Sequence, residues 1–307
     1  MAPTDMPGSS LAGRTVSEVV RTAAGRLGSV SEARWIVAHV TGLPVGELAA
    51  RAGDALDPDA VGAVDALVRR CRSGEPVQYA LGTWSFRGLE LAVDRRVLIP
   101  RPETEVLVDV ALDQLRAQAR AAAGDAQLVA VDLGSGSGAV ALSLAAEFDP
   151  RRALAVWATD AAEGALAVLR HNLDAMAARH PDAARRVRVG AGDWFAALPG
   201  ALAGSVALVV SNPPYVSEAE WADLDPRVRE HEPKGALVPG PSGLEAVGRI
   251  VRQARRWLAP GGSLVLEMAP SQVPVVGARA AALGYAAVES HTDLAGRPRV
   301  VVARTPS

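Results

Sequence analysis

The stretch LVAVDLGSGSGAVAL, residues 128–142, decides the fold class of this chain of 307 residues. Its first part is an apolar run, short enough for a buried strand, and the glycines that follow at 134, 136 and 138 open a helical pattern. Because these glycines have no side chains, a ligand can approach backbone N–H groups at the helix N-terminus. The stretch therefore predicts a strand, a ligand-binding turn and a helix.

The same alternation continues downstream and predicts a doubly wound, parallel α/β sheet. Seven apolar runs are expected as strands, at residues 128–134, 153–160, 187–193, 207–215, 261–269, 285–289 and 299–304. The helices expected beside them are residues 138–147, 161–179, 243–258 and 271–283.

The chain upstream of the glycine turn divides into two further parts. Residues 1–81 show apolar residues at helical spacing, with a helix start near Ser31 and stop signals such as Gly42, which predicts a small helical domain. Residues 82–100 hold aromatic and β-branched residues between turn signals, which predicts a β-hairpin linker. Residues 101–307, beginning with a helix from Glu103 to about Ala122, would then form the large α/β domain.

Composition and charge limit the classes of function. The net charge is −2, which argues against a general nucleic-acid binder, so no direct nucleic-acid partner is expected. Residues 1–13 lack the basic and apolar segments of a signal peptide, and no apolar run is long enough for a membrane span. A single cysteine, Cys71, excludes an intramolecular disulfide. We therefore expect a cytoplasmic protein without a membrane partner.

A cofactor site is expected around the turn Gly134–Ser135–Gly136–Ser137–Gly138. Asp160 ends the next strand, where a carboxylate can accept hydrogen bonds from ribose hydroxyls. NAD and S-adenosylmethionine both contain an adenosine ribose, so these features alone do not separate the two cofactors. A purely structural glycine turn is the third alternative.

Two details favour S-adenosylmethionine. Asp132 precedes the turn, near the expected place of the amino-acid part of the cofactor, although its carboxylate could instead cap the N–H groups of the turn. Asp193 and Trp194 follow the third predicted strand, in the position expected for adenine contacts, although Trp194 could instead be a core aromatic.

The sequence Asn212-Pro213-Pro214-Tyr215 ends the fourth predicted strand, at the edge where α/β sheets bind ligands. It suits methyl transfer to a planar nitrogen, whose delocalised lone pair is a poor nucleophile and must be aimed at the methyl carbon. The Asn212 side-chain oxygen and the Pro213 carbonyl can accept the two N–H groups of such a nitrogen, and the prolines stiffen both. The Tyr215 ring can stack on the planar group. A bare Pro-Pro turn is the alternative interpretation.

No other constellation of residues indicates a different chemistry. The five histidines show no metal-ligand spacing, so no metal site is expected. The Arg pairs are expected to lie on solvated faces.

The sequence resembles the release-factor glutamine methyltransferases, the PrmC/HemK family, from about Gly74 to the C-terminus. The resemblance rests on these motifs: GEPVQYALG, SFRGLEL, LIPRPETE (98–105), DLGSGSG, GDWF, SNPPY, RVREHEPKGAL (227–237) and DLAGRPRVVVAR. LIPRPETE is the most specific of them. The turn reads GSGSG where the family more often has GTGTG, a change that keeps the hydroxyl groups.

The resemblance implies a seven-stranded, Rossmann-like methyltransferase fold and N5-methylation of the glutamine of the Gly-Gly-Gln motif in peptide chain release factors. By position, Gly134 to Gly138, Asp160, Asp193, Trp194 and Asn212 would bind S-adenosylmethionine. Asn212 to Tyr215 would hold the glutamine, and Phe86 in the hairpin would wall the substrate pocket. The helical domain is expected to dock the substrate.

Three rival functions remain open at this point. An enzyme that methylates a glutamine of a ribosomal protein shares Asn-Pro-Pro-Tyr, but usually lacks the acid found here at Glu103. A methyltransferase acting on adenine or cytosine amino groups would use the same chemistry, but must also hold a polyanion. An NAD enzyme or a non-catalytic binding protein would leave Asn-Pro-Pro-Tyr unexplained.

Overall fold

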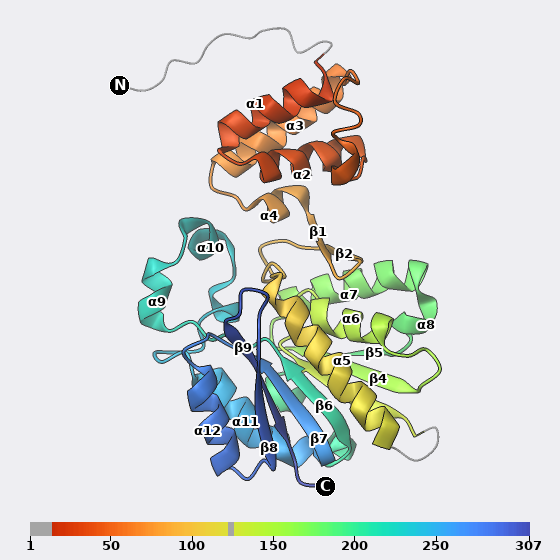
Figure 1. The fold of residues 1–307 in the computed structure, drawn as a ribbon, viewed down its shortest axis with the longest axis vertical. Helices are drawn as coiled ribbons and strands as arrows, with labels where there is room; N and C mark the ends of the chain where they lie inside the picture. The colour runs from red at the N-terminus through yellow and green to blue at the C-terminus, as the bar shows by residue number, and fades with distance from the viewer. Residues whose placement is uncertain (1–13, 122–125) are drawn as a thin grey trace. The chain divides into compact units, whose positions relative to one another are not determined.

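The computed structural model describes residues 14–121 and 126–307, and the chain divides into two compact units (Figure 1). The first unit ends at Gly82 and the second begins at Thr83. The expected absence of a signal peptide falls on residues 1–13, which lie outside the described residues. Within the described ranges, no helix combines the length and the apolar character that crossing a membrane requires.

The first unit is helical, and its helices begin and end at residues that suit those positions. Thr15 forms a capping box with Glu18, and Gly28 ends the first helix with a φ of 69°. The second helix begins at Val30, after its N-cap Ser29, so the start expected near Ser31 was one residue late, whereas Gly42 ends the helix as predicted. The elements are α1 (Val16–Leu27), α2 (Val30–Thr41), η1 (Val45–Glu47), α3 (Pro58–Arg72) and α4 (Val77–Leu81).

The second unit begins with the predicted hairpin, β1 (Thr83–Phe86) and β2 (Leu89–Ala92), followed by α5 (Glu103–Ala121). The strands of its seven-stranded sheet are β3 (Leu128–Leu133), β4 (Leu154–Asp160), β5 (Val187–Ala191), β6 (Val206–Ser211), β7 (Leu258–Glu267), β8 (Ala287–Thr292) and β9 (Pro298–Arg304). The helices around it are α6 (Ala139–Glu147), α7 (Glu163–Arg179), α8 (Pro181–Ala184), α9 (Glu218–Asp223), α10 (Pro226–His231), α11 (Glu245–Trp257) and α12 (Val273–Ala282). Short 3₁₀ turns lie at Trp194–Ala197, Gly200–Leu202 and Lys234–Ala236. The short helices α8, α9 and α10 were not predicted, because each is too short for a helical period to show.

The strand order is β5-β4-β3-β6-β7-β9-β8. The expectation of a parallel sheet is wrong for β9, which runs antiparallel to both β7 and β8. Residues 293–297 alone connect β8 to β9, and so short a connection cannot carry the crossover that a parallel pair needs. The sheet is therefore mixed, and the other pairings are parallel as predicted.

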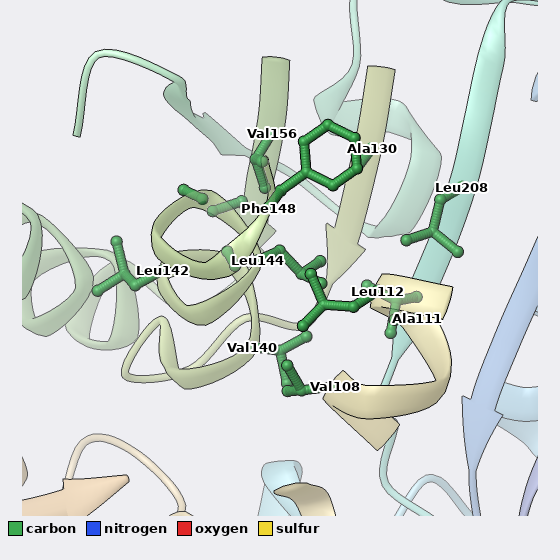
Figure 2. Packing of buried hydrophobic residues seen from close by; sticks show 14 of the residues in the cluster. Val108, Ala111, Leu112, Ala130, Val140, Leu142, Leu144, Phe148, Val156 and Leu208 are labelled. Atoms are coloured by element: carbon green, nitrogen blue, oxygen red, sulfur yellow. The ribbon is translucent and has the colours of Figure 1, made fainter. Parts of the chain in front are cut away.

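Helices cover both faces of the sheet, and successive residues of a strand point to opposite faces. Ala130 belongs to the core cluster that includes side chains of α5, α6 and α7, whereas Val131 belongs to the cluster that includes side chains of α11 and α12. Figure 2 shows the first cluster, to which α5 contributes Leu112, α6 contributes Leu144 and β3 contributes Ala130. The core thus holds the central strands rigidly between two helical layers.

The strand order reverses direction between β3 and β6. From β3 the chain moves outward to β4 and β5, and then returns to place β6 on the other side of β3. Such a switch point leaves a crevice at the carboxyl ends of the two strands. The glycine turn follows β3 and Asn212 follows β6, so the fold brings both to this crevice.

Candidate functional site

The turn after β3 depends on glycine at three positions. Gly134, Gly136 and Gly138 have φ values of 72°, 54° and 88°, in the left-handed region that other residues rarely adopt. A Cβ atom on Gly138 would also overlap the side chain of Leu169 in α7. Glycine is therefore required at 138 by both conformation and space.

Asp160 holds this turn in place. Its Oδ2 accepts the Gly136 N–H at 2.9 Å, and its Oδ1 accepts the Ala162 N–H at 2.9 Å. Each carboxylate oxygen keeps a further acceptor site, since a carboxylate can accept about four hydrogen bonds. Asp160 can therefore fix the turn and still accept ribose hydroxyls, as predicted. The role in fixing the turn was not predicted from the sequence.

The serines of the turn are buried and bound to the protein. Ser135 donates its hydroxyl to the Asp132 carbonyl at 3.0 Å, and Asn172 donates to the Ser137 carbonyl at 2.8 Å. Asn172 also exchanges hydrogen bonds with the backbone of Ala92 in the hairpin, at 2.7 and 3.1 Å. One buried amide therefore fixes the hairpin to the glycine turn.

Asp132 is buried beside the turn. Its Oδ2 accepts the Ala141 N–H in the first turn of α6 at 3.2 Å, so the carboxylate caps the helix that follows the turn. Burial raises the pKa of Asp132 to about 7, and the nearby Asp160 carboxylate acts in the same direction. The carboxyl also lines a small cavity of about 60 Å³, which includes the glycine turn, Thr104 and Asn212.

A larger cavity of about 420 Å³ shares Gly134, Gly136 and Asn212 with the small one. Of the predicted site residues, it is lined by Gly134, Gly136, Asp160, Asp193, Trp194, Asn212 and Pro214. Its wall is completed by side chains and backbone that the sequence analysis did not single out, among them Arg96, Leu98, Ala162, Pro233 and Ala236. Leu98 lies in the motif LIPRPETE, and Pro233 and Ala236 lie in RVREHEPKGAL. These two motifs, quoted above for the family resemblance, were the only sequence signal that could have pointed to this part of the cavity wall.

Trp194 contributes to the wall next to Gly134. A Cβ atom on Gly134 would lie 3.5 Å from Cζ3 of the indole, an ordinary contact, so position 134 needs glycine for its φ of 72° and not for space. Trp194 has a φ of 53°, an unusual value for a bulky residue, and it also packs against the core cluster of α11 and α12. Asp193 forms a half-exposed ion pair with Arg249 at 2.7 Å. Trp194 therefore lines the cavity and also packs against the core, so the two interpretations of this residue do not exclude each other.

The residues after β6 follow a rigid path along the cavity. The Asn212 amide nitrogen donates to the Thr104 hydroxyl at 3.1 Å, Pro213 is buried, and Pro214 lines the cavity. The Tyr215 carbonyl accepts a hydrogen bond from Gln272 at 2.9 Å. Burial raises the pKa of Tyr215 to about 12, so its hydroxyl keeps its proton at neutral pH.

Phe86 lies elsewhere in the second unit. Its side chain is buried in the core with Leu91 and Leu107, and it is not among the residues that line the two cavities described above. The predicted contact of Phe86 with substrate therefore stays a prediction to which this geometry adds nothing.

The loop after Tyr215 is fixed to the linker before α5. Glu232 is buried and pairs with Arg101, and it also accepts the Ile99 N–H at 3.4 Å. Burial raises the pKa of Glu232, while Arg101 lowers it. This pair joins residues 98–101 to residues 232–236, and both segments line the larger cavity.

Known protein families match parts of both units of the chain. Two family models match, the PrmC N-terminal domain over residues 21–82 and the methyltransferase small domain over residues 109–225. A release factor glutamine methyltransferase from Gloeobacter violaceus is 43% identical over 238 residues, 76% of this chain and 76% of that protein. Its counterpart from Burkholderia pseudomallei is 40% identical over 283 residues, 90% of this chain and 92% of that protein.

Proposed function

Because the chain belongs to the family of release factor glutamine methyltransferases, we propose that it methylates the N5 nitrogen of the glutamine in the Gly-Gly-Gln motif of peptide chain release factors, with S-adenosylmethionine as methyl donor. One observation carries this proposal. The glycine turn after β3 and Asn212 after β6 line the same cavity, so a donor and an acceptor can meet there. Release factors act in the cytoplasm, which is therefore the proposed location of the enzyme.

The cavity suits the methyl donor in size and in chemistry. Its volume of about 420 Å³ lies within the range of small-molecule sites. Gly134 and Gly136 place no side chain in the cavity. Asp160 offers acceptors for ribose hydroxyls, and the Trp194 ring offers a flat apolar wall for a base. When bound there, S-adenosylmethionine would supply a methyl group already activated on a sulfonium centre.

The remaining task of the protein is to position the amide nitrogen of the substrate. The Asn212 side-chain oxygen and the Pro213 carbonyl would accept its two N–H groups and so aim its lone pair. The buried Pro213 and the Gln272 bond to Tyr215 hold this segment still. The Tyr215 hydroxyl stays protonated, so it serves as a neutral neighbour and not as a base. The proton released from the methylated amide can pass to water.

The test is mass spectrometry of purified release factor after incubation with the enzyme and isotopically labelled S-adenosylmethionine. We expect one labelled methyl group on the Gly-Gly-Gln glutamine. Ribosomal proteins, DNA and RNA are the parallel substrates. Labelling of any of them in place of release factor would contradict the proposed function and identify the rival that is correct.

A further inference from the structure

A buried carboxyl lies beside Asn212 and has no role in the function proposed above. Glu267 ends β7, the strand next to β6, and the sheet register pairs Ser211 with Leu266, so Glu267 lies level with Asn212. Its side chain is 2% exposed, and within the described residues its Oε2 has no hydrogen-bond partner. A buried polar atom without a hydrogen-bond partner destabilises the folded state, so its presence needs an explanation.

Thr104 connects this carboxyl to Asn212. It lies in the first turn of α5, is 4% exposed, and accepts the Asn212 Nδ2–H at 3.1 Å. Burial raises the pKa of Glu267 to about 7, and hydrogen bonding with Thr104 and with Asn212 lowers it. The three side chains therefore form one polar group, sealed from solvent on the β7 side.

The chemistry of these groups sets the direction of their hydrogen bonds. Because the Thr104 oxygen accepts the Asn212 Nδ2–H, its single hydroxyl proton is left to be donated to Glu267, which in its ionised form can only accept. Asn212 can act on Glu267 only as a donor, through its amide nitrogen, because hydrogen bonding with Asn212 lowers the pKa of that carboxyl. The amide oxygen of Asn212 is left as the atom turned away from this group, and Asn212 lines both cavities.

We propose that Glu267 and Thr104 are positioning residues that fix the direction of the Asn212 amide, so that its oxygen is presented to the N–H of the substrate glutamine. This inference rests on the proposed function. A reversed Asn212 amide would present its own N–H groups to the substrate amide, and two donors facing each other repel. The carboxylate thus acts on the reaction through Asn212 and without touching the substrate.

The experiment compares Thr104→Val, which removes the hydroxyl, with Thr104→Ser, which keeps it. Ser263→Ala is the matched control, because Ser263 is a fully buried residue of the same strand as Glu267, bonded to Gln114 at 3.0 Å away from the site. For each full-length variant, kcat and KM are measured on release factor, together with the dissociation constant for S-adenosylmethionine and the unfolding midpoint.

We expect Thr104→Val to lower kcat by about tenfold or more while S-adenosylmethionine affinity stays within about twofold of wild type. Thr104→Ser should restore kcat, and Ser263→Ala should lower the midpoint but not kcat. Glu267→Gln, which offers Thr104 a donor as well as an acceptor, should also lower kcat, and it carries the same test if Thr104→Val does not fold.

Two results would overturn the positioning role. One is a Thr104→Val enzyme as active as wild type, and the other is a loss of kcat matched by Ser263→Ala. These results are distinct from a failure of the proposed function, in which the wild-type enzyme itself leaves release factor unmethylated and the positioning role falls with it.

Discussion

Replacing Asp132 with asparagine should stabilise the protein at alkaline pH. Burial raises the pKa of Asp132 from 3.8 to about 7. Between these two pH values the Asp132 carboxyl is ionised in the unfolded state and mostly neutral in the folded state. The stabilising contribution of this group is complete below the unfolded pKa and is lost as the pH rises through the folded pKa. At 1.36 kcal/mol per pKa unit, the penalty near pH 8 is at most about 4 kcal/mol.

The asparagine side chain removes the charge and keeps an acceptor for the Ala141 N–H, but it buries an amide N–H₂ in exchange. Allowing for that group, we expect Asp132→Asn to gain about 2 kcal/mol of unfolding free energy near pH 8, and progressively less toward pH 5. Guanidinium unfolding of both proteins across this range measures the difference. Asp223→Asn, at an exposed position at the end of α9, is the control and should show no such trend.

A difference between Asp132→Asn and wild type that stays constant with pH would refute the reasoning. So would a variant that is less stable than wild type near pH 8 but equal to it near pH 5, because the burial of charge would then not be the dominant effect.

Three further outcomes are expected. Asn212→Ala should keep its unfolding midpoint and lose about a hundredfold or more in methyl transfer to release factor, and full activity in this variant would exclude the proposed grip on the amide. Asp160→Ala should weaken S-adenosylmethionine binding by about 1–3 kcal/mol in calorimetry, because the charged acceptor for the cofactor and for the Gly136 N–H is lost; unchanged affinity would reject this role. Gly138→Ala should lower the free energy of unfolding by about 2 kcal/mol or more, since it combines a φ of 88° with overlap against Leu169, and a wild-type denaturation curve would show that the turn relaxes freely.

Patterns local in the sequence predicted most of the second unit. The glycine turn, the apolar run before it and the helix after it are adjacent in the chain, so their positions follow from residues 128–147 alone. That Asn212 lies beside this turn also follows, because the carboxyl ends of neighbouring parallel strands meet at one edge of a sheet. The antiparallel course of β9 could be expected only from the shortness of its connection to β8, which the sequence analysis did not weigh.

The features that were missed depend on residues distant in the chain. Nothing near Thr104 indicates that its hydroxyl meets an amide 108 residues later, and Glu267 looks like the ordinary end of an apolar strand. Asp160 was expected to bind only a ligand, yet it also fixes the turn, because the sequence does not reveal which N–H groups a loop leaves unpaired. Such pairings are set by tertiary packing and have no periodic signal.

Two of the buried carboxyls of this unit, Asp132 and Glu267, occupy equivalent places on either side of β6. Asp132 lies on β3, one neighbour of that strand, and Glu267 ends β7, the other. Burial raises the pKa of both to about 7, Asp160 adding to the effect at Asp132 and Glu103 at Glu267, where Arg299 opposes it. Folding therefore favours the neutral form of each group, whereas the direction of the Asn212 amide depends on an ionised Glu267. A core selected for stability alone would place apolar side chains at both positions. The cost of burying these two carboxyls falls beside Asn212, the residue whose amide must be oriented. Groups that cost stability are expected at such a place when they serve the reaction.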